Sequence, residues 1–139
     1  MFGGVRRIVD PKLGELTRRG RSWNGQMTID GGVVVPLVLP GGRAGPDSDA
    51  IAMISAALSD YERIRPLVRD ALADHRPESS LDDTTGLEVP DPIHATVISL
   101  DGQQTVELGY RVDWDEEHTL GARIRGGALI ELCGSVLPP

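Results

Sequence analysis

The sequence predicts an α+β fold: a mostly antiparallel sheet of six to seven strands, with a central bent helical pair packed on one face. Apolar and polar residues alternate in both the first and the last third of the chain, as in strands that bury one face. Apolar residues recur at helical spacing only in the middle. Glycine-containing turns separate the alternating segments.

The first alternating segments are expected to form a meander. Asp10–Thr17 leads into a strand after an Asp-Pro turn, and Ser22–Asp30 alternates with Trp23 on its apolar side. The sequence Asp30-Gly31-Gly32 favours a hairpin turn.

The next segment, Val33–Leu39, is a β-branched run that contains Pro36. Proline has no N–H to donate to a neighbouring strand, so this run is predicted to be an edge strand or a strand with a bulge. A free edge here would also allow copies of the chain to pair as a homo-oligomer.

The middle of the chain predicts two helices. Asp47 or Ser48 is suited to cap the first helix, which carries an apolar stripe. Pro66 is expected in the first turn of the second helix, where its missing N–H costs nothing. The pair should end near His75. The stripe comprises Ile51, Ile54, Leu58 and Tyr61.

The C-terminal half predicts a second hairpin-rich meander after a long polar loop over residues 76–92. Its strands are Ile93–Leu100, Thr105–Trp114, Thr119–Arg125 and Ala128–Cys133. Turns are expected at Asp101-Gly102 and Gly126-Gly127. Residues 1–139 are expected to form a single domain, because neither half has enough apolar surface alone.

Composition indicates a cytoplasmic protein. No apolar run approaches the ~20 residues that span a bilayer, and the first ten residues contain no secretory h-region. One cysteine, Cys133, forms no internal disulfide and is expected to be a small core residue. No motif indicates a cofactor or a metal; the glycine-rich Gly41–Ser48 loop lacks the ending of a P-loop.

The net charge of −7 argues against generic nucleic-acid binding and suits a basic protein partner. Thirteen of the 14 basic residues are arginines, and their scatter along the chain is typical of a GC-rich coding bias.

The densest chemical stretch is W-D-E-E-H-T-L-G-A-R-I, residues 114–124. The interpretation we favour is a turn at Asp115-Glu116 between two strands, with Trp114 in the core. Neighbouring strand residues point to opposite faces, so Glu117 and His118 should not pair with each other. A metal would require the carboxylates of Asp113, Asp115 and Glu117 to converge, and alternate positions ~7 Å apart along a strand do not converge. A turn that folds Asp113, Glu117 and His118 onto one point would favour a site instead.

The chain resembles a family of small uncharacterised bacterial α+β domains, some of which occur near toxin and immunity genes. The resemblance implies a single α+β domain and brings no catalytic set. It covers most of the chain and rests on the opening P-K-L-G-E-L-T and Trp23, then on Trp114, Glu117, His118, Thr119, Leu120, Gly121, Gly127 and the segment Glu131–Val136.

These observations favour a non-enzymatic, protein-binding domain, of immunity type or an accessory protein, with an acidic contact surface. The alternative is a hydrolase that uses the Glu117 and His118 region, with or without a metal. A cleft that holds His118, a carboxylate and a second polar group would favour the hydrolase. The residues predicted to contact the partner are Asp113, Asp115, Glu116, Glu117 and His118, with Asp82 and Asp83 in the long loop.

Overall fold

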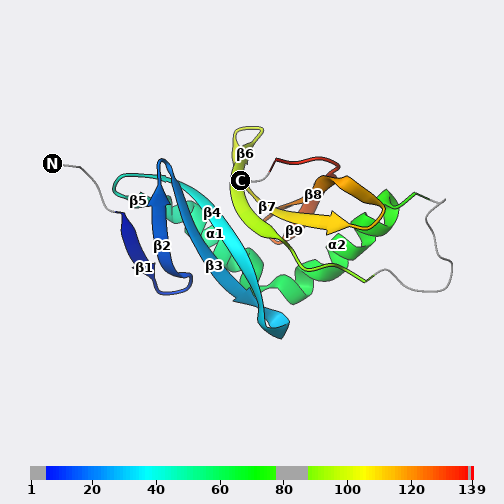
Figure 1. Ribbon diagram of the computed structural model, residues 1–139, viewed down its shortest axis with the longest axis horizontal. Helices are drawn as coiled ribbons and strands as arrows, with labels where there is room; N and C mark the ends of the chain where they lie inside the picture. The colour runs from blue at the N-terminus through cyan, green and yellow to red at the C-terminus, as the bar shows by residue number, and fades with distance from the viewer. Residues whose placement is uncertain (1–5, 78–87, 138) are drawn as a thin grey trace.

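The strands of the described residues form one sheet, in the order β1-β2-β3-β4-β6-β7-β8-β9, with β5 paired to β4 (Figure 1). The structure is a computed structural model that describes residues 6–77, 88–137 and 139. The strands are β1 (Arg7–Asp10), β2 (Gly14–Arg19), β3 (Ser22–Ile29), β4 (Val33–Gly42), β5 (Gly45–Pro46), β6 (His94–Leu100), β7 (Gln103–Val112), β8 (Asp115–Arg125) and β9 (Ala128–Cys133).

The predicted α+β class, the mostly antiparallel sheet and the helices packed on it are confirmed. The predicted count of six to seven strands is too low, because the sheet has nine. The two missed strands are β1 and β5, which span four and two residues and are too short to show an alternating pattern.

The two meanders meet at a parallel pair in the middle of the sheet. Leu37 and Val38 of β4 pair with Ala95 and Thr96 of β6, whereas all other neighbouring strands are antiparallel. Parallel neighbours need a crossover connection. Both helices lie in this connection and lie together behind the sheet in Figure 1.

The prediction that Val33–Leu39 is an edge strand is wrong. This segment belongs to β4, which pairs with β3 along its length and with β6 at Leu37 and Val38. Pro36 lies just before the residues that pair with β6, so its missing N–H removes no bond from that ladder. The outermost strands of the sheet are β1 and β9. Because β4 pairs with β6 only at Leu37 and Val38, a homo-oligomer through this segment stays a prediction.

The helices are α1 (Ser48–Ser59) and α2 (Tyr61–His75). Asp47 caps α1 as predicted, because its carboxylate accepts hydrogen bonds from the backbone N–H groups of Asp49 and Ala50. The predicted position of Pro66 is wrong. The first helix ends at Ser59, Asp60 separates the two helices, and Pro66 lies inside α2. In the described residues, neither helix is long and apolar enough to cross a membrane.

The predicted tight turns of the C-terminal meander are confirmed. Asp101 and Gly102 have φ angles of 52° and 76°, and Gly126 and Gly127 have φ angles of 61° and 78°. Two successive residues with positive φ form the turn that matches the twist of paired strands. These turns fix the register of β6, β7, β8 and β9.

The core lies between the two helices and one face of the sheet, and it takes residues from both meanders. Trp23 and Tyr110 are fully buried, and the Tyr110 hydroxyl lies 2.6 Å from the hydroxyl of Tyr61 on α2. This buried hydrogen bond links the second helix to β7. The other large, fully buried side chains are Leu16, Leu37, Leu39, Ile54, Ile64, Leu72, Leu108, Leu120 and Ile124.

Candidate functional site

The end of the β7–β8 hairpin carries most of the residues predicted to contact a partner. Val112 pairs with Asp115, so the turn is Asp113-Trp114 and the predicted turn at Asp115-Glu116 is wrong. Trp114 is half-buried, and its indole N–H donates to Nδ1 of His75 at the end of α2, over 3.1 Å. Trp114 also packs against the hydrophobic core, as expected in part, and its contact with His75 ties the turn to α2.

A bulge in β8 places His118 beside Asp115. Tyr110 pairs with Leu120 whereas Val112 pairs with Asp115, so β8 has extra residues between these two positions. Nδ1 of His118 lies 2.8 Å and 3.0 Å from the two carboxylate oxygens of Asp115. The hydrogen bond from His118 lowers the pKa of Asp115 below its ordinary value.

The remaining acids of the hairpin end face solvent. Asp113, Glu116 and Glu117 are exposed, and among the described residues their side chains form no ion pair. Asp82 and Asp83, the other two predicted contact residues, lie outside the described residues. The hairpin end therefore presents three free carboxylates next to one carboxylate that His118 already binds.

The alternative of a hydrolase that uses the Glu117 and His118 region stays a prediction. His118 pairs with Asp115 and not with Glu117, and within residues 6–77 and 88–139 no three His, Cys, Asp or Glu groups could hold a metal. Cys133, expected in the core, is half-buried on β9, and its thiol donates to the carbonyl of Ser135 over 3.3 Å.

An ion pair between a buried carboxylate and a half-buried arginine lies on the helix-free face of the sheet, and it was not predicted from the sequence. Glu107 is almost fully buried, and its carboxylate accepts a hydrogen bond from Nε of Arg123 over 3.0 Å. Arg123 also donates to Glu131 on β9. Alternation places Glu107 on the polar face of β7, and nothing in that pattern distinguishes a buried carboxylate from a solvated one.

His94 lies on the same face and is also buried. Its imidazole packs over Gly109 on β7, where an added Cβ atom would lie 2.3 Å from Cε1 of the ring. Nε2 of His94 has no hydrogen-bond partner among the described residues. Burial lowers the pKa of His94, and the nearby charge of Glu107 opposes that shift.

The lowered pKa of His94 predicts a loss of stability in mild acid. In the unfolded chain His94 takes up a proton near its ordinary pKa of about 6.5, whereas in the folded chain it takes up the proton only at lower pH. The free energy of unfolding therefore falls as the pH drops below about 6.5. Above that pH the residue is neutral in both states. Urea unfolding between about pH 7 and about pH 5.5 should show His94→Gln losing less stability than the wild type, by on the order of 1 kcal/mol.

Both proteins keep His75 and His118, so the difference between them isolates His94. Equal losses in the two proteins would contradict the assignment of a neutral, buried imidazole.

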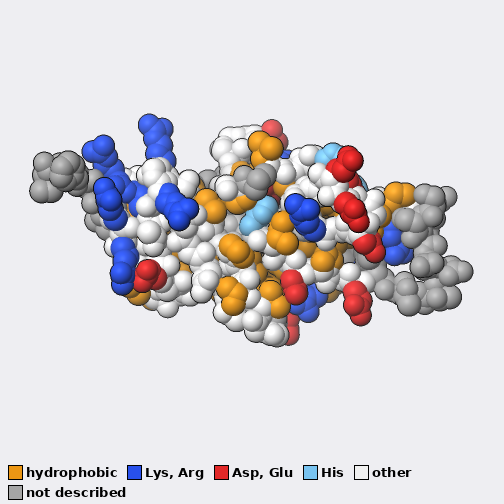
Figure 2. Space-filling model, in the orientation of Figure 1, with side chains coloured by type: hydrophobic (Ala, Val, Ile, Leu, Met, Phe, Trp, Pro, Cys, Tyr) orange, Lys and Arg blue, Asp and Glu red, His pale blue; other side chains and the backbone are white. Residues whose placement is uncertain are grey.

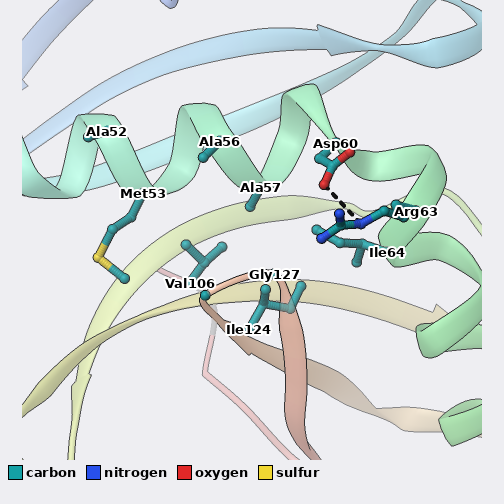
Figure 3. Close-up of a pocket in the computed structure, with 11 residues that line it drawn as sticks. Ala52, Met53, Ala56, Ala57, Asp60, Arg63, Ile64, Val106, Ile124 and Gly127 are labelled. Carbon is teal, nitrogen blue, oxygen red and sulfur yellow. Dashed lines mark ion pairs between the residues drawn. The ribbon is translucent and has the colours of Figure 1, made fainter.

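An apolar pocket of about 470 Å³ lies between the helices and the β8–β9 turn (Figure 3). Side chains such as Met53, Val106 and Ile124 line it, and Arg63 lies at its rim with Nε 3.2 Å from the carboxylate of Asp60. None of the residues predicted to contact a partner lines this pocket.

Charge is strongly segregated along the molecule. Residues 1–46 contain seven bases and three acids, whereas residues 47–139 contain seven bases and 18 acids. Figure 2 shows basic side chains gathered over the end that carries β1 to β3, and acidic side chains mainly over the opposite end, near β8. The overall charge of −7 conceals this separation.

Comparison with known proteins found no matching family model, no matching curated protein and no matching solved structure.

Proposed function

We propose that this protein is a non-enzymatic, protein-binding domain, of immunity type or an accessory protein, which engages a basic surface on a partner protein. The proposal rests on one observation: Asp113, Glu116 and Glu117 project from the end of the β7–β8 hairpin with no ion-pair partner among the described residues. The resemblance to small bacterial domains near toxin and immunity genes, which is inferred from the sequence alone, would imply the same class of function.

The hairpin end is suited to recognition because its backbone is held in place before a partner arrives. Trp114 ties the turn to α2 through His75, and His118 ties the bulge to Asp115. Binding would therefore require little ordering of the backbone. Unpaired carboxylates at one end of an acidic molecule also accelerate encounter with a basic surface, an effect that salt weakens.

The experiment is partner capture from the native host, mass spectrometry, and affinity measurement with the purified partner. The double variant Glu116→Lys/Glu117→Lys should weaken binding by on the order of tenfold or more, mainly by slowing association. The fold should tolerate both changes, because both side chains are exposed.

The matched control is Asp70→Lys/Asp74→Lys on the exposed side of α2, which changes the net charge equally. We expect it to retain most of the affinity. An equal loss in both double variants would mean that only net charge matters, and unchanged affinity in the hairpin variant would exclude this surface as the contact.

A further inference from the structure

Three arginines surround a hollow at the basic end of the sheet. The hollow has a volume of about 630 Å³, and it is lined by Arg18, Gly20, Arg21, Gly41, Gly42 and Arg43, with no acidic residue among them. We propose that this hollow binds a compact, multiply charged phosphoryl anion such as a diphosphate group.

Two hairpin turns bring these arginines together. Arg18 lies near the end of β2, Arg21 in the turn between β2 and β3, and Arg43 in the turn between β4 and β5. The backbone N–H of Gly41 donates to the carbonyl of Arg21 over 3.1 Å, which joins the first turn to β4 just before the second turn. Residues that are distant in sequence thus line one hollow.

Trp23 anchors the end of β4, next to the turn that carries Arg43. Its indole N–H donates to the carbonyl of Gly42 over 3.0 Å, and its ring is fully buried. A Cβ atom on Gly41 would lie 2.7 Å from Cδ1 of Trp23, so glycine is needed for the turn to approach the ring. The turns are therefore anchored before any ligand binds, which lowers the cost of ordering them.

The positive charge of the hollow is not neutralised within the described residues. Arg18, Arg21 and Arg43 form no ion pair there. Two acids near in sequence have other partners: Glu15 pairs with Arg7, and Asp47 caps α1. A cluster of like charges without counter-charges attracts an anion, and guanidinium groups bind oxyanions through paired N–H donors.

The number of arginines and the charge of the rest of the molecule define the class of ligand. One guanidinium satisfies a carboxylate through two parallel bonds, whereas a phosphoryl group has more oxygens and more charge to share among three arginines. A long nucleic acid would extend from this end towards the acidic half, residues 47–139, and be repelled there. A compact anion avoids that repulsion.

Calorimetric titration of the full chain with pyrophosphate tests the proposal, with ADP and citrate as further probes. Pyrophosphate should bind saturably at one site, more tightly than citrate at equal ionic strength, and less tightly as salt rises. Comparable binding of ADP would identify the diphosphate group as the recognised part, and much tighter binding of ADP would identify a nucleotide as the source. Both results support the proposal.

The variant Arg21→Gln/Arg43→Gln should weaken pyrophosphate binding by about tenfold or more, because two of the three guanidinium groups that would donate charge-assisted hydrogen bonds are lost. Both arginines are exposed, so folding should be unaffected. The control Arg69→Gln/Arg111→Gln removes the same charge from exposed positions elsewhere and should stay within about twofold of the wild type. Absence of saturable pyrophosphate binding, or equal weakening in both variants, would overturn the proposal.

Discussion

Replacing Trp23 with alanine should lower the free energy of unfolding by about 3–5 kcal/mol, a large part of the roughly 5–15 kcal/mol that holds a domain of this size. The indole is fully buried on β3, beside Leu39 of β4 in the strand register. Alanine would leave a cavity there and would also remove the donor to the carbonyl of Gly42.

Fluorescence gives a direct measurement, because the chain has only two tryptophans. Trp114 is half-buried in the β7–β8 turn, and Trp114→Phe makes Trp23 the sole indole reporter for urea unfolding. Circular dichroism then compares this background with the same background carrying Trp23→Ala. Coincident fluorescence and dichroism transitions in the background would show that β3 unfolds together with the rest of the sheet.

Trp23→Phe separates packing from hydrogen bonding. Phenylalanine retains most of the buried ring but has no N–H for Gly42, so its cost should be well below that of alanine. An alanine variant that loses less than about 1 kcal/mol would contradict the close packing of Trp23 in this core.

Local sequence signals predicted much of the fold because their physical causes are local. The glycines at Gly102, Gly126 and Gly127 adopt positive φ angles that other residues resist, and the turns there lie where they were expected. Asp47 caps α1 because an aspartate just before an apolar helical stripe satisfies the first free N–H groups.

Features that depend on strand partners could not be predicted in the same way. The position of β4 in the sheet follows from its parallel pairing with β6, more than fifty residues later in the chain. Pro36 suggested an edge, but only the register shows that β6 begins its pairing one residue beyond it. The contact between His118 and Asp115 likewise depends on a bulge, which regular strand periodicity does not anticipate.

The candidate sites, too, could be predicted only in part. The acidic stretch at Asp113 to His118 is visible in the sequence, whereas its turn position and the Asp115–His118 pair are visible only in the structure. The basic hollow was missed because the arginines were interpreted as scattered. Counting charges separately over residues 1–46 and 47–139 would have revealed the segregation.

The buried pair of Glu107 and Arg123 should cause the second large effect. Arg123→Met keeps an apolar side chain of similar length but leaves the carboxylate of Glu107 without its cation, and that side chain is only 5% exposed. Removing one partner of a buried pair costs about 3–5 kcal/mol, so the free energy of unfolding should fall by that order. The control Arg111→Met removes an exposed arginine that has no ion pair among the described residues, and should change stability by about 0.5 kcal/mol or less.

A double-mutant cycle separates the charge from the packing. Glu107→Leu/Arg123→Met removes both charges, and it should recover most of the stability that Arg123→Met loses, because no buried carboxylate then remains unpaired. Glu107→Leu alone should cost less than Arg123→Met, since Arg123 keeps Glu131 as a partner that is partly exposed. If the double variant were as unstable as Arg123→Met, the arginine would contribute mainly through packing of its stem, and the helix-free face would not depend on a buried ion pair.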